Sequence, residues 1–186
     1  MYCNPEIESS YHINDIGQTI YDYIIKEKPM TVVEFGCLFG YSTVTIAMAL
    51  RDIGSNGKLY CYDLWDEYPY KHSTIEITKS NLKKYQLENY VEFIKMDFYD
   101  WLKDPIEFDI MHLDISNNGK TIQDAYLNLK NKINNGSIIL FEGGSIERDE
   151  VEWMLKYDYP PINGIKHIVD YEILNSKFPS LSVIRK

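Results

Sequence analysis

Apolar residues follow two alternating patterns along the chain. Short apolar runs bounded by turn residues are typical of buried strands, and apolar residues at i, i+3, i+4 and i+7 predict amphipathic helices. The runs predict strands at 32–35, 58–62, 90–96, 108–113, 137–141, 164–171 and 180–185. The helical spacing predicts helices at 13–28, 41–50, 74–89 and 99–102, one carrying Ile122, Ala125, Tyr126 and Leu129, and one from 147 to about 158.

The alternation of strands and helices sets the expected fold class. Five strands separated by helices imply right-handed crossover connections and hence a parallel sheet. The last two predicted strands follow one another closely and would form a hairpin at the end of this sheet. No Pro-, Gly- or Ser-rich linker divides the 186 residues. We therefore expect a single domain over 1–186, with an N-terminal helical segment at 1–28 and a core at 29–186.

A turn that contains two glycines, EFGCLFGYS, joins the first predicted strand to the next helix. Amides at a helix start are unpaired, and glycine lets a ligand approach the backbone, so this turn is a candidate small-molecule site. A dinucleotide loop, G-x-G-x-x-G, needs glycine where this chain has Leu38 and Tyr41, so a pyrophosphate fits badly. Glu34 would favour a ligand that carries an ammonium or sulfonium group.

This turn resembles the first motif of class I S-adenosylmethionine-dependent methyltransferases, most closely the E-x-G-x-x-x-G-Y-S form of the catechol and sugar O-methyltransferase branch. The resemblance implies S-adenosyl-L-methionine as cofactor and a doubly wound, Rossmann-like α/β sheet of seven strands, with an antiparallel last strand and helices on both faces. An ordinary strand–helix turn and a nicotinamide-dependent oxidoreductase remain as alternatives. The expected cofactor-binding residues are Glu34, Gly36, Gly40, Ser42, Asp63, Asp97 and Phe98.

Acidic residues also follow the second and third predicted strands. Asp63 lies 23 residues after Gly40, where a carboxylate can accept both hydroxyls of a ribose. In the resembling family, the Asp at the third strand tip, here Asp97, binds the adenine amino group, and the next amide, here that of Phe98, meets a ring nitrogen. An ionised Asp only accepts hydrogen bonds, which suits an amino group. The alternatives are a loop Asp without a ligand at 63 and a helix N-cap at 97.

Two further carboxylates, Asp114 and Glu142, end the fourth and fifth predicted strands. A hydroxyl acceptor must lose its proton to a general base or become more acidic on a metal ion. In the resembling metal-dependent O-methyltransferases, an Asp at the first place and an Asp-Asn or Asp-Asp pair at the second hold the metal. Here the pair reads Glu142-Gly143, so a third ligand is missing, and two carboxylates remain for Mg²⁺ completed by waters.

Many sugar methyltransferases of this family also carry a His three residues after the fourth-strand Asp. This chain has Asn117 there, which cannot accept a proton. We therefore expect Asp114 and Glu142 to flank the acceptor, either as a metal pair or as a base and its orienter. They could also be two ordinary strand-tip carboxylates. His112 lies within a strand and is predicted to be a core histidine.

Composition restricts the expected partners and compartment. The formal net charge is −9 and the sequence pI is about 4.9, so the protein's field would repel nucleic acid and anionic membranes. Three cysteines without C-x-x-C spacing favour reduced thiols over disulfides or zinc. The sequence shows neither a signal-peptide pattern nor a membrane span, so we expect a cytoplasmic protein.

With these patterns, the resemblance implies an S-adenosylmethionine-dependent methyltransferase, and we expect it to O-methylate a small hydroxylated or glycan-type metabolite. The loop after the second strand carries Tyr68, Tyr70 and His72 on the expected acceptor side. The alternatives are a cofactor-binding module without activity and a methyltransferase that acts on carboxylates or amines. Since no lid is evident, a second copy of the chain is a candidate to close the acceptor site, as in a homo-oligomer.

Overall fold

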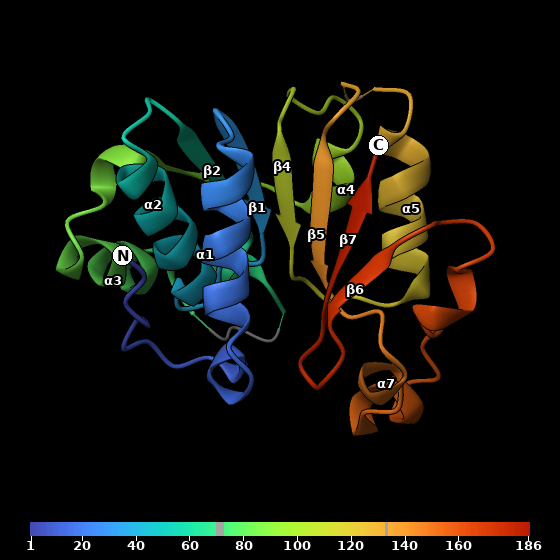
Figure 1. Ribbon diagram of the computed structural model, residues 1–186. Helices are drawn as coiled ribbons and strands as arrows, with labels where there is room; N and C mark the ends of the chain where they lie inside the picture. The colour runs from blue at the N-terminus through green and yellow to red at the C-terminus, as the bar shows by residue number, and fades with distance from the viewer. Residues whose placement is uncertain (70–72, 133) are drawn as a thin grey trace.

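The computed structural model describes residues 1–69, 73–132 and 134–186. Its strands are β1 (Thr31–Phe35), β2 (Lys58–Asp63), β3 (Val91–Lys95), β4 (Ile110–Leu113), β5 (Ile138–Glu142), β6 (Glu172–Asn175) and β7 (Leu181–Arg185). They form one sheet in the order β3-β2-β1-β4-β5-β7-β6 (Figure 1). β7 is antiparallel to β5 and β6, and the other pairings are parallel. The predicted seven-stranded sheet with an antiparallel last strand is thus confirmed.

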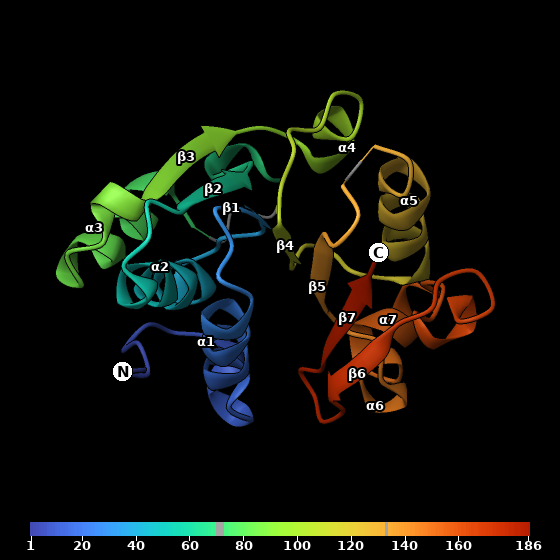
Figure 2. The ribbon, with the colours of Figure 1, turned by 45° about the horizontal axis from the view of Figure 1, so that its top comes forward.

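Helices cover both faces of this sheet. They are α1 (Ile16–Glu27), α2 (Tyr41–Ile53), α3 (Ile75–Lys84), α4 (Phe98–Trp101), α5 (Gly119–Leu129), α6 (Ile146–Asp149) and α7 (Glu152–Lys156). Short 3₁₀ turns occur at Ser10–Ile13, Trp65–Glu67, Glu88–Tyr90 and Asn163–Ile165. Figure 1 and Figure 2 show α1, α2 and α3 on one face and α4 and α5 on the other. The predicted arrangement of helices on both faces is therefore also confirmed.

The central strand β1 supplies both halves of the core. Val33 and Phe35 pack in a cluster that includes Ile122 of α5, whereas Val32 packs in a cluster with residues of α1 and α2. Successive side chains of a strand point to opposite faces, so Glu34 lies on the same side of the sheet as Val32. The Glu34 carboxylate therefore lies on the face of the sheet that α1 and α2 cover.

The C-terminal part differs from the prediction in two places. The strand predicted at 164–171 is wrong, because the amides of Ile168 and Val169 both donate to the carbonyl of Ile165 in a local turn. Ile165 and Val169 are buried there as anchors of a loop, and the strand β6 starts only at Glu172. The single helix predicted from 147 is split into α6 and α7, because Val151 between them has an extended backbone (φ −67°, ψ 150°).

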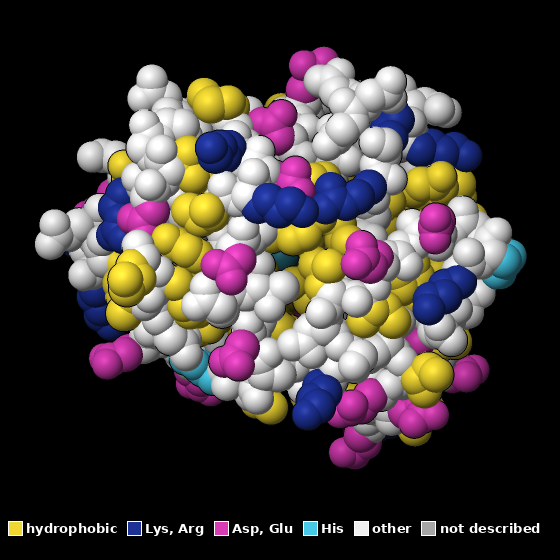
Figure 3. Space-filling model, viewed as in Figure 1, with side chains coloured by type: hydrophobic (Ala, Val, Ile, Leu, Met, Phe, Trp, Pro, Cys, Tyr) yellow, Lys and Arg dark blue, Asp and Glu magenta, His cyan; other side chains and the backbone are white. Residues whose placement is uncertain are grey.

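Charged side chains are mixed over the surface. Figure 3 shows Lys and Arg side chains standing among acidic and apolar ones on the face seen in Figure 1. Within the described part of the chain, no helix has both the length and the apolar character needed to cross a membrane.

Candidate functional site

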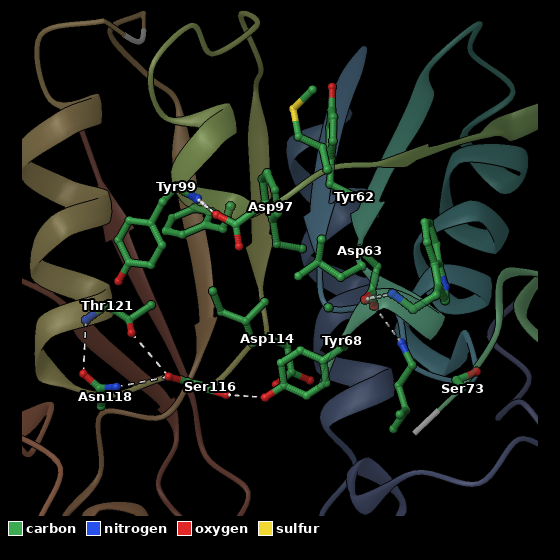
Figure 4. A pocket seen from close by; sticks show the side chains of 18 of the residues that line it. Tyr62, Asp63, Tyr68, Ser73, Asp97, Tyr99, Asp114, Ser116, Asn118 and Thr121 are labelled. Carbon is green, nitrogen blue, oxygen red and sulfur yellow. Dashed lines mark hydrogen bonds between the residues drawn. The ribbon is translucent and has the colours of Figure 1, made fainter. Parts of the chain in front are cut away.

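A cavity of about 650 Å³ opens at the carboxyl ends of the central strands (Figure 4). Its walls include Gly36 after β1, Asp63 at the end of β2, Asp97 after β3 and Asp114 after β4. The strand order reverses between β1 and β4, because the chain runs outward to β3 on one side and to β5 on the other. Open parallel sheets bind ligands at such a switch point.

Gly36 lets the ends of β1 and β4 meet at the floor of this cavity. Its backbone is left-handed (φ +86°), and a Cβ placed there would lie 1.7 Å from the main-chain oxygen of Asp114. No residue with a side chain fits that space. Gly40 is also left-handed (φ +91°), but it starts α2 and does not line the cavity. The two glycines therefore differ in role: one shapes the cavity and the other starts a helix.

Asp63 ties the turn after β1 to the end of β2. Its Oδ2 accepts hydrogen bonds from the amides of Cys37 (2.7 Å) and Leu38 (3.3 Å), and its Oδ1 accepts one from the amide of Trp65 (2.9 Å). An ionised carboxylate offers about four acceptor positions. One position is thus left for a donor in the cavity, which Asp63 also lines.

Asp97 caps α4 and lines the same cavity. Its Oδ1 accepts from the amides of Tyr99 (2.8 Å) and Asp100 (3.3 Å), so the N-cap that was one alternative for this residue is present. Its Oδ2 has no hydrogen-bond partner among the described residues. Phe98, the next residue, also lines the cavity. The cap and a ligand contact use different oxygens and are compatible.

Glu34 lies behind the cavity rather than in it. Its carboxylate is fully buried, accepts a hydrogen bond from Thr43 Oγ1 (2.5 Å) and lies 3.2 Å from His112 Nδ1. Burial raises the pKa of Glu34, but hydrogen bonds from His112, Ser42 and Thr43 outweigh burial, so the net shift is downward and the group is ionised. Neither Glu34 nor Ser42 lines the cavity. Both instead fasten the first turn of α2 to the sheet.

The two expected catalytic carboxylates are in different positions. Asp114 lines the cavity, and burial raises its pKa although His112, Tyr11 and Arg148 act in the opposite direction. Glu142 does not line it. Its two oxygens accept hydrogen bonds from Nε and Nη2 of Arg148, which is 2 % exposed. The pair that the sequence placed on either side of the acceptor therefore consists of one cavity residue and one half of a buried ion pair.

This ion pair decides the question of a metal. With both Glu142 oxygens on a guanidinium, Mg²⁺ beside Asp114 would have a single free carboxylate and a neighbouring positive charge. Among the described residues, the one group of three potential ligands is Glu34, Cys37 and Cys61, which are buried and satisfied behind the sheet. The residues at the end of β4 and β5 do not fit a Mg²⁺ site.

Several residues that line the cavity had no signal in the sequence. They are Ser10, Ser116, Asn118, Thr121 and Trp153. Figure 4 shows the hydroxyl group of Tyr68, which the sequence did suggest, pointing toward Ser116, 3.2 Å away. Of the other two loop residues suggested with Tyr68, both Tyr70 and His72 lie outside the described residues.

Trp153 is held in place from two directions. The guanidinium carbon of Arg148 lies 4.4 Å from its ring centroid, and the ring of Tyr159 meets it edge-on at 5.8 Å. The buried Glu142–Arg148 pair thus backs an aromatic wall of the cavity. Arg148, Trp153 and Tyr159 lie far from Asp114 in the sequence, so a distant part of the chain completes this wall of the cavity.

Comparisons with known proteins agree with this geometry. A family described as methyltransferase domain matches residues 33–142, more than half of the chain. A search of curated proteins gives no match. The fold is similar to that of an O-methyltransferase from Bacillus cereus solved with S-adenosylhomocysteine, at 18% identity over 98% of this chain and 84% of that one, with a TM-score of 0.67.

Two further solved structures are similar at this level. The O-methyltransferase TomG from Streptomyces achromogenes, solved with S-adenosylmethionine, is 14% identical over 91% of this chain and 79% of its own, with a TM-score of 0.65. The methyltransferase PaMTH1 from Podospora anserina is 17% identical over 91% and 76%, with a TM-score of 0.65. The chain therefore belongs to the methyltransferase domain family, and its fold is that of the class I S-adenosylmethionine-dependent O-methyltransferases.

Proposed function

We propose that this protein transfers the methyl group of S-adenosylmethionine to a hydroxyl oxygen of a small acceptor bound beside Asp114. The observation that carries the proposal is the position of Asp114. It is a carboxyl group with a raised pKa, and it lines the cavity of a methyltransferase fold together with the hydroxyl-bearing side chains of Ser10, Ser116 and Thr121. A base with a raised pKa binds a proton from a hydroxyl more readily.

The other carboxylates of the cavity suit the adenosyl donor. Asp63 has one acceptor position left for a ribose hydroxyl, and the free oxygen of Asp97 suits an amino group such as that of adenine. Among the described lining residues, Asp63, Asp97 and Asp114 are the charged ones, and all three are negative. This charge favours a sulfonium over a diphosphate. Bound S-adenosylmethionine supplies an electrophilic methyl group, and the chain's residues position the acceptor for in-line attack.

The acceptor side fits a small hydroxylated ring. Ser10, Ser116 and Thr121 offer hydroxyl groups, and Trp153 offers an apolar surface, which is the combination that binds a sugar or a phenol. The O-methyltransferases among the structural neighbours support oxygen as the accepting atom. Since the residues do not fit Mg²⁺, we assign removal of the acceptor proton to Asp114.

The test is methyl transfer from radiolabelled S-adenosylmethionine to a panel containing a catechol, a methyl glycoside, a carboxylic acid and a primary amine. We expect transfer to a hydroxyl acceptor, unchanged by chelator. Asp114→Asn should lower the rate by about 10²- to 10⁴-fold, the usual contribution of a general base. The exposed Asp104 provides the control, since Asp104→Asn should keep the rate.

Three outcomes would contradict the proposal. Methyl transfer to the amine or to the carboxylic acid alone would show that the accepting atom is not a hydroxyl oxygen. An unchanged rate in Asp114→Asn would remove this residue from the reaction. Binding of S-adenosylhomocysteine by calorimetry without transfer to any acceptor would favour a cofactor-binding module without activity.

A further inference from the structure

Two thiols and a carboxylate meet in the interior, on the face of the sheet that α2 covers. Glu34 of β1 and Cys61 of β2 are paired neighbours in the parallel register of these strands, and Cys37 lies in the turn that follows β1. Their ligand atoms, one carboxylate oxygen and two sulfurs, all lie within 4.8 Å of one another. Cys37 is 2 % exposed, and Glu34 and Cys61 are 0 % exposed. Methyl transfer as proposed above gives the two thiols no part.

The distances within this group are those found between the ligands of one metal ion. Cys61 Sγ lies 3.3 Å from Glu34 Oε2 and 4.0 Å from Thr43 Oγ1. Two sulfurs that each bind zinc at about 2.3 Å in a tetrahedron are about 3.8 Å apart. An ion between Glu34, Cys37 and Cys61 can therefore contact all three after small movements of their side chains. The Thr43 hydroxyl, 2.5 Å from Glu34 Oε2, offers an oxygen for the fourth place.

The chemistry of the donor set selects the class of ion. Mg²⁺ takes oxygen ligands, whereas two sulfurs beside a carboxylate suit a softer ion such as Zn²⁺. The second oxygen of Glu34 lies 3.2 Å from His112 Nδ1, and carboxylates that bind metals are commonly held by such an outer hydrogen bond. The cysteines lack C-x-x-C spacing, so the group becomes visible only once β1 and β2 are paired.

We propose that Glu34, Cys37 and Cys61 form a buried binding site for a divalent cation that prefers sulfur ligands, such as Zn²⁺. Burial raises the pKa of both thiols, that of Cys61 to about 12, so both are protonated while the site is free of metal. A thiol that coordinates a metal is deprotonated, so binding sends two protons to the solvent, while Glu34 is already ionised. Two thiolates and one carboxylate carry three negative charges, of which the cation neutralises two.

A bound ion fastens the turn after β1 to the sheet. The Cys37 amide donates to Asp63 Oδ2 (2.7 Å), and Asp63 and Gly36 line the cavity. An ion that joins Cys37 to Glu34 of β1 and Cys61 of β2 holds the turn where this hydrogen bond requires it. None of the three ligands lines the cavity, so the ion touches neither donor nor acceptor. A closed site of this kind is typical of a structural metal ion.

The test is titration with Cd²⁺, a thiol-binding ion with the filled d shell of Zn²⁺, under a phosphine reductant that keeps the thiols free. All proteins carry Cys3→Ser, which removes the exposed cysteine. We expect one ion per chain, an ultraviolet absorption band of cadmium–sulfur bonds and a cadmium-113 resonance typical of two sulfur ligands. Loss of an outer partner already weakens metal binding 10- to 100-fold, so Cys37→Ser and Cys61→Ser should each weaken it about 100-fold or more. Asp97→Asn, a change at a cavity carboxylate, should keep the affinity.

The site is contradicted if Cd²⁺ does not bind, if Cys61→Ser binds it with unchanged affinity, or if Asp97→Asn abolishes binding. Should the serine variants not fold, the cadmium-113 resonance of the Cys3→Ser protein decides, because the cavity carboxylates contribute no sulfur. Zn²⁺ should raise the thermal midpoint of Cys3→Ser and leave that of Cys3→Ser with Cys61→Ser in place. An unchanged midpoint with the ion bound overturns its structural role. These measurements need no S-adenosylmethionine, so the metal site can fail while methyl transfer stands, and the reverse.

Discussion

The two parts of the cavity that we assign to the methyl donor and to the acceptor, here called the donor half and the acceptor half, are built in different ways. The donor half is made of main-chain amides and strand-tip residues, and Asp63 reaches its partners Cys37, Leu38 and Trp65 through backbone groups. The acceptor half depends on side chains brought together from both ends of the sequence, such as Ser10 and Trp153, and the Trp153 ring is backed by Arg148. The comparison shows that the donor half is carried by local backbone geometry, whereas the acceptor half exists only once the whole sheet is assembled.

The largest effect is expected where the acceptor half depends on a single distant contact. Arg148→Met removes the guanidinium and leaves the Glu142 carboxylate buried without a partner, which should lower the free energy of unfolding by about 3–5 kcal/mol. Arg185, 47 % exposed in its pair with Glu27, is the matched control, and Arg185→Met should cost less than about 1 kcal/mol. Urea unfolding measures both. Equal losses would mean that the buried pair does not support the acceptor half.

The next effect tests the backbone of the donor half. Gly36→Ala puts a Cβ against the Asp114 carbonyl in a left-handed backbone, so we expect a loss of about 2–4 kcal/mol and no measurable binding of S-adenosylhomocysteine. Gly54 is also left-handed (φ +71°) with open space around it, and Gly54→Ala should cost only about 1 kcal/mol and keep binding. Unfolding curves and calorimetry report the two quantities. Similar behaviour of the two variants would show that the close approach of β1 and β4 is unimportant.

A smaller effect is expected at the carboxylate of the donor half. Asp63→Asn turns one oxygen into an NH₂ group that faces either the Cys37 or the Trp65 amide, so one donor is left unpaired. Affinity for S-adenosylhomocysteine should fall about 10- to 100-fold, which corresponds to about 1.5–3 kcal/mol for a charged hydrogen bond. Titration calorimetry measures this, with Asp104→Asn as the control. Unchanged affinity would remove Asp63 from the donor site.

The smallest effect concerns the pH dependence of stability. Burial raises the pKa of Asp114 in the folded state, so its contribution to stability is complete below its unfolded value of about 3.8 and is lost as pH rises toward the folded value. The Asp114→Asn variant has no carboxyl group at this position, so its stability does not fall with pH in this way. As the pH rises above about 4, the free energy of unfolding of the wild type should therefore fall relative to that of Asp114→Asn, as urea unfolding at each pH would show. Parallel curves would mean that Asp114 carries no buried charge.

The same contrast explains which parts of the candidate site could be predicted from the sequence. The strand pattern and the rule that ligands bind at the carboxyl ends of parallel strands suffice to bring Gly36, Asp63, Asp97 and Asp114 to one cavity. Glu34 was expected beside the ligand because of its closeness in sequence. Strand parity places its side chain on the face opposite to Phe35, which lines the cavity, and Glu34 itself does not line it.

Other contacts near the site could not be predicted, because the residues that make them are far apart in the sequence. Tyr11 lies at hydrogen-bond distance from His112 across 101 positions of the sequence, and the bond from Arg148 to Glu142 follows from the way two short helices fold back on the sheet. The strand expected at 164–171 failed for a related reason. Its apolar residues are anchors of a loop, and their burial depends on the neighbouring α5 rather than on strand pairing.

The central claim is that the cavity beside Asp63, Asp97 and Asp114 holds the adenosyl donor. The most direct measurement is a crystal structure of the protein with S-adenosylhomocysteine. Our account predicts ribose hydroxyls on Asp63, the adenine amino group on Asp97 and the sulfur atom directed toward Asp114. A molecule bound elsewhere, or an empty cavity that admits a dinucleotide instead, would contradict it.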